Sequence, residues 1–284
     1  MRFSFTIEPV NRSIITCLPL LLLLFLGACQ TGTQAPPPAI PTPYSESVTI
    51  GIASSAAPFA DLIVTPFMAF SPATTINVVT ANTNTLLADL AARQLDAVLV
   101  HALPPNHPFW FNPVALDGVA LIIHPDNPIE QLSTAEVQAL LSGRLTRWTA
   151  VGGADQPVHL LSREQGSGAR LLINQQIMAE QRLSINSQLL AGNNALLTAV
   201  AANPDALGYT MMGAVPESVK FIAIDDIFPT TVTTANQAYR LTTPLYFVTR
   251  EEPTGAVRTL LAWLQSPSGQ EQIGTKYGRV LFSP

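Results

Sequence analysis

Cysteine is scarce in this chain, which has two among 284 residues, and charged residues make up only 12% of it. Both cysteines, Cys17 and Cys29, lie within or directly after an N-terminal apolar run, so the residues beyond Cys29 have no partners for a disulfide among themselves. The formal net charge is −5, which argues against a nucleic-acid partner because such proteins carry basic patches. With 48% hydrophobic residues, the chain can build a core without cross-links.

Sequence motifs of common enzymes are also missing. Around Ser167, the positions where a nucleophile elbow needs glycine hold Gln165 and Ala169. No phosphate-cradling GxxxxGK[ST] stretch occurs, and the four histidines have neither metal-site spacing nor cysteine partners. We therefore expect a binding protein and not an enzyme, with no cofactor and no metal.

The N-terminal apolar run covers residues 14–26 and is followed by the sequence Gly-Ala-Cys, which ends at Cys29. The run is short for a membrane-spanning helix, and small residues before a cysteine are typical of a lipoprotein signal peptide. We expect a signal peptide over 1–28, lipidation of Cys29 and a proline-rich linker over 29–45. The protein would then be extracytoplasmic and anchored to the cell membrane by lipid. A retained anchor helix is the alternative.

Strands alternate with helices along the rest of the chain, which indicates a largely parallel sheet. Ser133 and Glu136 have the spacing of a capping box, for a helix that ends near Gly143. The expected strands cover residues 48–53, 76–80, 96–100, 118–124, 158–162, 221–224 and 245–249. The expected helices include residues 61–63, 82–91, 133–143, 171–178, 196–202 and, as the final helix, 254–264.

An anion-binding turn is indicated by residues 163–170, with the sequence REQGSGAR. The turn joins a predicted strand to a predicted helix, so the first amides of that helix have no intrahelical acceptor and favour an anion. Arg163 adds a planar donor fork and Ser167 adds a hydroxyl, while Gly166 and Gly168 let the backbone approach a ligand closely. The alternative is a plain glycine-serine turn, with Arg163 in a surface ion pair with Glu164 or another carboxylate.

Two motifs follow one another along the chain. The first is LSGRLTRWTAVGG at residues 141–153, and the second is SREQGSGAR at residues 162–170. In this order they resemble the motifs of the phosphate-binding proteins that serve ABC transporters. A weaker likeness extends from Val48 to about Gly278. The resemblance implies the two-lobe α/β fold of type II periplasmic binding proteins, in which two crossing strands join the lobes and the ligand lies in the cleft between them.

The resemblance also implies the organisation and the function of the chain. Residues 46–122 with 245–284 would form lobe I, residues 123–244 would form lobe II, and strands at 120–123 and 241–248 would cross between them. The protein would capture an inorganic oxyanion, phosphate above all, and hand it to an ABC permease in the membrane, acting as a monomer. The alternative is an extracytoplasmic sensor or interaction domain of the same fold, with altered or no anion binding.

By this likeness, three strand-to-helix turns converge on the anion. The expected ligand contacts are Ser54, Ser55, Asn84, Thr85, His101, Arg163, Ser167, Gly168 and Ala169. For Ser54 and Ser55, helix capping alone is the alternative. Gly168 and Ala169 would donate backbone amides only, because Ala169 replaces the threonine that the family has at this point.

His101 is a second departure from the family pattern, since many of its members place an aspartate just after the third strand. A histidine there would donate to the anion, and its charge would change around neutral pH. The alternative is a strand-end residue that is hydrogen-bonded within its own lobe. Trp148 and Tyr209 are expected to be packing residues.

Overall fold

The structure is a computed structural model that describes residues 45–214, 216 and 218–280. The predicted signal peptide, the predicted lipid site Cys29 and the predicted linker, apart from Ser45, lie outside the described residues. Throughout the part of the chain that the structure describes, no helix combines the length and the apolar character needed to cross a bilayer.

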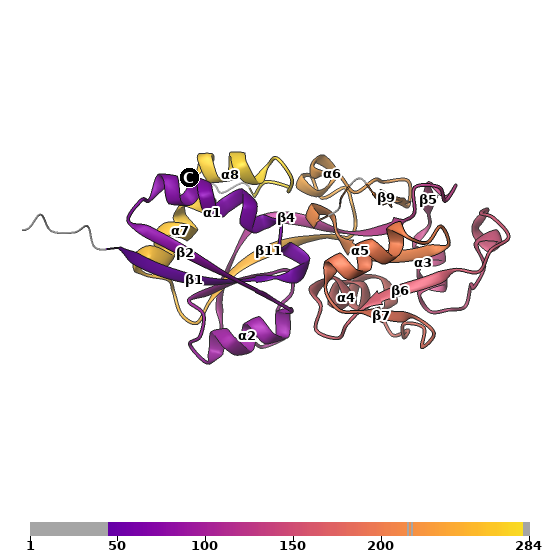
Figure 1. Ribbon diagram of the computed structural model, residues 1–284, viewed down its shortest axis with the longest axis horizontal. Helices are drawn as coiled ribbons and strands as arrows, with labels where there is room; N and C mark the ends of the chain where they lie inside the picture. The colour runs from indigo at the N-terminus through magenta and orange to yellow at the C-terminus, as the bar shows by residue number, and fades with distance from the viewer. Residues whose placement is uncertain (1–44, 215, 217, 281–284) are drawn as a thin grey trace, which may run out of the picture. The chain divides into compact units, whose positions relative to one another are not determined.

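The strands form two parallel groups joined by antiparallel neighbours. Their bounds are β1 (Glu46–Ala53), β2 (Thr74–Ala81), β3 (Ala97–Val100), β4 (Trp110–Ile123), β5 (Gln131–Leu132), β6 (His159–Arg163), β7 (Gln188–Leu190), β8 (Ala206–Met211), β9 (Lys220–Phe221), β10 (Ala223–Ile224) and β11 (Thr242–Thr249). Among the described residues, the main sheet has the order β2-β1-β3-β11-β4-β8-β6-β7, with β9 beside β4, and β5 pairs with β10 separately (Figure 1).

Pairing directions divide the main sheet. β2, β1 and β3 are parallel, and so are β8, β6 and β7. β11 is antiparallel to both β3 and β4, and β4 is antiparallel to β8. The predicted parallel arrangement therefore holds inside each group and fails where the groups meet.

Two long strands cross between the groups, as Figure 1 shows for β4 and β11. β4 pairs with β11 from Trp110 to Gly118 and with β8 from Val119 to Ile123. The predicted crossing segments, residues 120–123 and 241–248, belong to β4 and β11, but β4 begins at Trp110, well before its apolar run. Its first half, which includes polar residues, makes the crossing pair.

The helices follow the strands as the sequence pattern predicts, with exceptions near the C-terminus and after the 163–170 turn. Their bounds are α1 (Phe59–Phe70), α2 (Thr83–Ala91), α3 (Thr134–Leu141), α4 (Gly168–Ile173), α5 (Asn193–Ala201), α6 (Thr231–Ala235), α7 (Gly255–Gln265) and α8 (Pro267–Ile273). The capping box of α3 is confirmed, since the Glu136 carboxylate accepts from Ser133 N at 2.8 Å. α7 is not the final helix, because α8 follows it. The helix predicted over 171–178 is α4 continued by a π-helical turn at Asn174–Met178.

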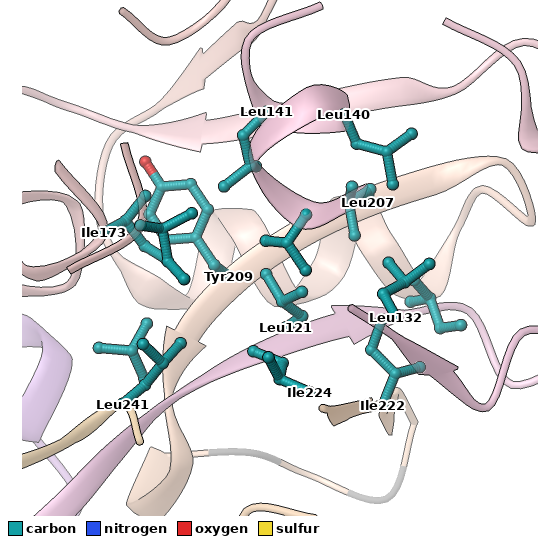
Figure 2. Packing of buried hydrophobic residues seen from close by; sticks show 14 of the residues in the cluster. Leu121, Leu132, Leu140, Leu141, Ile173, Leu207, Tyr209, Ile222, Ile224 and Leu241 are labelled. Atoms are coloured by element: carbon teal, nitrogen blue, oxygen red, sulfur yellow. The ribbon is translucent and has the colours of Figure 1, made fainter. Parts of the chain in front are cut away.

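Two large hydrophobic cores lie against the sheet, one beside each strand group. The middle core collects buried residues from Val119 to Leu241, and it includes Trp148 and Tyr209, which confirms their predicted packing role (Figure 2). The terminal core combines residues 48–115 with residues 245–277. The chain thus leaves the terminal core once, builds the middle core and returns, which places the ends of several strands from both groups near the crossing strands.

Candidate anion-binding site

The turn at the start of α4 meets two turns from the other strand group. Ser55 lies in the 3-10 turn Ser54–Ala56 that follows β1, and Thr83 is the first residue of α2. A Cβ atom placed on Gly168 would lie 3.3 Å from Thr83 Oγ1 and 3.4 Å from Ser55 Oγ. The structure therefore brings together three strand-to-helix turns, with two hydroxyl groups on the same side of Gly168.

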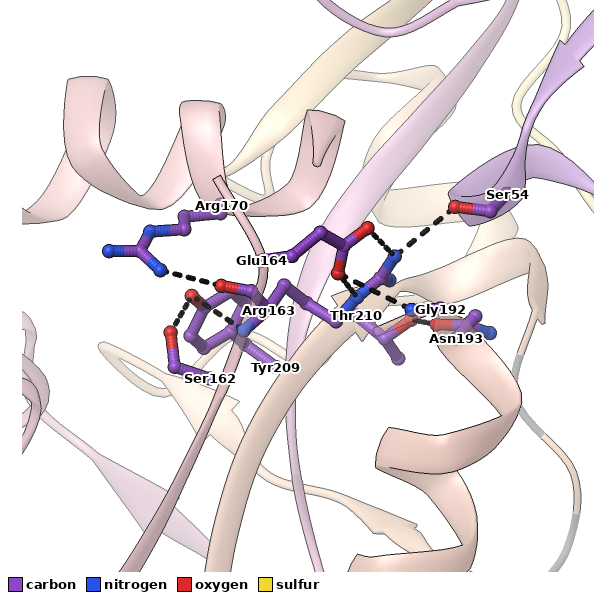
Figure 3. Close-up of polar contacts among 9 residues, drawn as sticks. All are labelled: Ser54, Ser162, Arg163, Glu164, Arg170, Gly192, Asn193, Tyr209 and Thr210. Atoms are coloured by element: carbon purple, nitrogen blue, oxygen red, sulfur yellow. Dashed lines mark hydrogen bonds and ion pairs between the residues drawn. The ribbon is translucent and has the colours of Figure 1, made fainter. Parts of the chain in front are cut away.

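Arg163 is buried at the end of β6, and its guanidinium is held between two partners (Figure 3). Nε and Nη2 donate to the two carboxylate oxygens of Glu164 at 2.9 and 3.0 Å, and Nη2 also donates to Ser54 Oγ at 3.1 Å. The alternative prediction, a surface ion pair with Glu164, names the right partner. The pair is not on the surface, however, because the Arg163 side chain has no exposed area. Such a two-point contact fixes the orientation of the guanidinium plane.

Three buried polar atoms at this junction have no hydrogen-bond partner within the described residues. They are Thr83 Oγ1, Ser167 Oγ and Arg163 Nη1. An unsatisfied buried polar group costs roughly 1–3 kcal/mol, so a native protein retains several together where a ligand or ion accounts for them. A guanidinium donates only, and hydroxyls can also donate. The matching ligand is a small group rich in acceptor oxygens, such as a tetrahedral oxyanion.

Glu164 balances part of the Arg163 charge. Burial raises the pKa of the Glu164 carboxyl, but hydrogen bonds and the positive charge from Arg163 lower this pKa, and so does the amide of Gly192, which donates to Oε2 at 3.3 Å. The net pKa lies below its ordinary value. The carboxylate therefore stays ionised near neutral pH and occupies Nε and Nη2, which leaves Nη1 as the unpartnered donor of the guanidinium.

His101 belongs to a buried series of polar contacts that ends in the same site. Its Nδ1 lies 3.4 Å from Ser55 Oγ, and its Nε2 lies 3.1 Å from Asp117 Oδ2. His101 Cβ would lie 3.8 Å from a Cβ added to Gly168. The structure therefore places His101 behind Ser55 and also pairs it with Asp117. The contact with Asp117 agrees with the alternative prediction, in which His101 is hydrogen-bonded within its own lobe.

Asn84 and Thr85 differ in their positions. Thr85 is exposed, and its amide donates to the side chain of Asn82, the N-cap of α2, at 2.9 Å. The structure does not bring Thr85 to the other predicted contacts. Asn84 touches the turn itself, because a Cβ added to Gly166 would lie 2.9 Å from Asn84 Nδ2. Gly166 has a φ of +89°, a backbone conformation that favours glycine.

Thr83 and Asp117 are site residues that sequence reasoning missed. Thr83 lies on the buried face of α2 together with Leu86 and Leu90, so the helical spacing of those leucines was the signal that could have found it. Asp117 is a charged residue in the middle of a strand that is otherwise mostly buried, which is itself unusual unless the charge is paired.

The remaining predicted residues lie at the start of α4. Ser167 is its N-cap, and Ala169 packs its methyl group into the middle core, so only the amide of Ala169 can serve a ligand. Arg170 supports the turn by donating to the Arg163 carbonyl at 2.7 Å. Tyr209 lies below, with its hydroxyl 2.6 Å from Ser162 Oγ (Figure 3).

A cavity of about 490 Å³ has His101 in its wall. Its lining combines the loop from His101 to His107 with Phe111, Leu172, Gln175, Gln176, Thr242, Thr243, Pro244 and Tyr246. The walls therefore come from both strand groups. Among the described residues, no group of three or more histidine, cysteine or carboxylate side chains is arranged to hold a metal ion.

Comparison with known proteins gives a consistent result. The model of the PBP superfamily domain matches residues 36–268 of this chain. The phosphate-binding protein PstS of Bacillus subtilis (strain 168) is 25% identical over 251 residues, which covers 83% of this chain and 81% of that protein.

Solved structures show the same fold. A putative phosphate ABC transporter substrate-binding protein with bound phosphate, from Clostridium perfringens, gives a TM-score of 0.79 at 24% identity, covering 83% of this chain and 100% of that one. An ABC-type phosphate transport receptor from Vibrio cholerae gives a TM-score of 0.68 at 22% identity, covering 82% of this chain and 100% of that one. These similarities confirm the predicted two-lobe α/β fold.

Proposed function

The chain belongs to the PBP superfamily, and on that premise we propose that it is a solute-binding protein that captures phosphate and delivers it to an ABC importer. The observation that carries this proposal is a set of three buried polar atoms, on Thr83, Arg163 and Ser167, that have no partner in the part of the chain that the structure describes. They come from α2, β6 and the N-cap of α4, and two more hydroxyls, on Ser54 and Ser55, lie beside them.

The choice of phosphate rests on the relatives and on the chemistry of the site. The Bacillus subtilis relative is named a phosphate-binding protein, and the Clostridium perfringens structure contains bound phosphate. Hydroxyls can accept a hydrogen bond as well as donate one, which suits an oxyanion that still carries hydrogen. We propose binding without chemical conversion of the anion, so the protein is not an enzyme.

We propose that the ligand contacts are Ser54, Ser55, Thr83, Asn84, Arg163, Ser167 and the amides of Gly168 and Ala169, with His101 acting through Ser55. The two cores support a division into lobe I, residues 46–122 with 245–284, and lobe II, residues 123–244. Arg163 and Ser54 lie on opposite sides of that division, so closure of the two lobes on the anion would be the working motion.

We propose an extracytoplasmic location with a lipid anchor at Cys29, based on the signal-peptide pattern before it. The permease that receives the anion would lie in the same membrane. Replacing Cys29 by serine tests the anchor, with the protein expressed in its own host and separated into membrane and soluble fractions. Membrane retention of the Cys29→Ser protein would contradict lipidation and favour the retained anchor helix.

Titration calorimetry of the purified protein with phosphate, sulfate, molybdate and tungstate tests the function. We expect saturable heat with phosphate, and an affinity at least about a hundredfold lower after Arg163→Ala, because a charge-assisted bond in a buried site is lost. Arg258→Ala is the matched control, since Arg258 pairs with Glu252 through exposed side chains and lies outside the site.

Thermal unfolding provides a second measurement of the same binding. Ligand at about 1,000 times its dissociation constant stabilises the folded protein by roughly 4 kcal/mol. Unchanged phosphate binding by the Arg163→Ala protein would remove Arg163 from the site. No heat and no stabilisation with any of the four oxyanions would overturn the proposal and favour the sensor or interaction domain.

A further inference from the structure

Asp117 is a buried carboxylate whose partners fix its role. It lies in the middle of β4 with no exposed area. Its Oδ1 accepts from the amide of Gly118 at 2.8 Å and from the amide of Gly213 at 3.2 Å. Because a backbone amide only donates, Oδ1 must be an acceptor. Oδ2 is then left for His101 Nε2, at 3.1 Å.

This arrangement selects one tautomer of His101. An ionised carboxylate has acceptors only, so the hydrogen between Oδ2 and Nε2 belongs to the imidazole. In a neutral imidazole the other ring nitrogen is then an acceptor. Nδ1 faces Ser55 Oγ at 3.4 Å, and Ser55 must therefore donate its hydroxyl hydrogen to Nδ1.

Ser55 connects this series of contacts to the anion site. Ser55 is buried, and its Oγ would lie 3.4 Å from a Cβ on Gly168, on the same side as Thr83 Oγ1. A hydroxyl whose hydrogen points to Nδ1 can offer only its lone pairs to a ligand. Ser55 differs in this respect from Thr83 and Ser167, whose hydroxyls have no partner within the described residues.

The other groups around His101 do not supply a competing proton. Thr243 Oγ1 donates to the His101 carbonyl at 3.3 Å and not to the ring. Burial, and then the negative charges of Asp117 and Asp61, raise the pKa of the Tyr277 phenol well above its ordinary value, so it stays neutral. The Arg163 charge is engaged by Glu164. The cavity wall beside His101 adds His107 and Tyr246, and burial raises the pKa of the Tyr246 phenol.

We propose that Asp117, acting through His101, fixes the direction of the Ser55 hydroxyl and thereby makes the site prefer an oxyanion that still carries a proton. Asp117 and His101 are positioning residues, and Ser55 is the group that touches the ligand. This inference deepens the proposed function and rests on it, because it assumes that the site holds an oxyanion.

Hydrogen phosphate and sulfate distinguish a Ser55 hydroxyl that accepts a hydrogen bond from the ligand from one that donates to it. Hydrogen phosphate can donate its P–O–H hydrogen to the Ser55 oxygen, whereas sulfate has no hydrogen near neutral pH and would face lone pairs. A Ser55 hydroxyl held toward Nδ1 should therefore favour hydrogen phosphate over sulfate.

Asp117→Asn reverses the series of contacts without changing its shape. The asparagine oxygen is held by the amides of Gly118 and Gly213, so its NH₂ group faces Nε2. Nε2 must then accept, the hydrogen moves to Nδ1, and Ser55 is free to donate to the ligand. The same exchange of tautomers follows when the aspartate of a Ser-His-Asp triad becomes asparagine. Asp155→Asn is the matched control, because Asp155 pairs with Arg147 on the surface.

The experiment combines two measurements on the unmodified protein and the two variants. Long-range proton–nitrogen NMR of labelled histidine reports the tautomer of His101 without any ligand. Calorimetry at about pH 8 gives the phosphate-to-sulfate affinity ratio. We expect the Nε2–H tautomer in the unmodified protein and the Nδ1–H tautomer in Asp117→Asn. The affinity ratio should fall at least about tenfold in that variant, which is the weight of one hydrogen bond to a charged group.

The outcomes separate the two proposals. If Asp117→Asn changes the tautomer while the affinity ratio stays the same, or if the unmodified protein carries Nδ1–H, this inference is overturned and phosphate capture stands. If the unmodified protein binds neither anion, the proposed function is overturned and the inference with it.

Ser55→Ala covers the case in which Asp117→Asn does not fold. Removal of the hydroxyl should lower the phosphate-to-sulfate affinity ratio at least about tenfold, because the oxygen that accepts from hydrogen phosphate is lost. A variant that keeps the ratio of the unmodified protein would overturn the assignment of Ser55. Equal weakening of both anions would also overturn it, because a purely structural role for Ser55 leaves the ratio unchanged.

Discussion

Nη2 of Arg163 donates a hydrogen bond to Ser54 Oγ at 3.1 Å, across 109 positions of sequence. Ser54 follows β1, whose side chains belong to the terminal core, whereas Arg163 ends β6, whose neighbours belong to the middle core. Neither core alone can therefore build the candidate site. Its geometry depends on how β4 and β11 hold the two cores together, and several consequences can be measured.

Thr83→Ala should weaken phosphate binding about tenfold to a hundredfold, because it removes a buried hydroxyl that we place against a charged ligand. Thr85→Ala, two positions further along α2, should leave the affinity unchanged, since Thr85 is exposed. Calorimetric titration of both variants makes this comparison. Equal losses in the two proteins would show that α2 contributes through its stability and not through Thr83.

Gly168→Ala should reduce phosphate affinity by about tenfold or more with a small effect on folding. The new methyl group would lie 3.3 Å from Thr83 Oγ1 and 3.4 Å from Ser55 Oγ, which is closer than most Cβ atoms approach another atom. It would therefore occupy space beside two hydroxyl groups that we place at the anion. Thermal unfolding without ligand, followed by titration, separates the two effects. Full affinity in this variant would place the anion away from the start of α4.

Glu164→Gln should destabilise the protein at neutral pH and progressively less in acid. The pKa of Glu164 is lower in the folded protein, so its stabilising contribution is complete above the unfolded-state pKa of about 4.3 and is lost as pH falls through the folded pKa. The loss should stay below the ~3–5 kcal/mol of a fully buried pair, because the Glu164 side chain is 26% exposed.

Thermal unfolding of the Glu164→Gln protein and of the unmodified protein between pH 7 and pH 3 makes this measurement. The difference between the two melting temperatures should narrow below about pH 4.3. Glu252→Gln, in the exposed pair with Arg258, is the control and should change stability little. If the difference in melting temperature between the Glu164→Gln protein and the unmodified protein stays constant across the whole pH range, the lowered pKa of Glu164 is contradicted.

Leu121→Ala should cost about 2–5 kcal/mol of unfolding free energy, because Leu121 is fully buried in the middle core and its removal leaves a cavity. Val232→Ala in α6 should stay within about 0.5 kcal/mol, since Val232 is largely exposed. Urea unfolding of both proteins provides the comparison. Similar losses would mean that the middle core is less tightly packed than the complete burial of Leu121 implies.

The sequence was sufficient for local structure wherever a physical signal lies within a few residues. The Ser133–Glu136 capping box and the strand-turn-helix around Ser167 are examples, since periodicity, caps and glycines act locally. The sequence was less informative where an element depends on distant partners. The start of β4 at Trp110 is set by pairing with β11, and α8 was overlooked although Ser266 caps it and Pro267 begins it.

The same distinction applies to the site. The anion-binding turn at Arg163 and Ser167 carries its own chemistry in consecutive residues. Asp117 could not be assigned in this way, because its partners His101 and Gly213 lie 16 and 96 positions away and reach it only through the sheet. A small difference in position on α2 decided between an exposed threonine and a buried one, and helix phase is not fixed until the N-cap Asn82 is known.

The return of the chain to the terminal core sets an order on biosynthesis. The members of the middle core are all present once Leu241 has been made, whereas the terminal core still lacks residues 245–277. Until β11 is synthesised, β3 keeps an unpaired edge, which is a template for aggregation. A nascent chain therefore holds Arg163 in a nearly finished lobe while the lobe that carries Ser54 waits for the C-terminal segment, and the ability to bind ligand comes last.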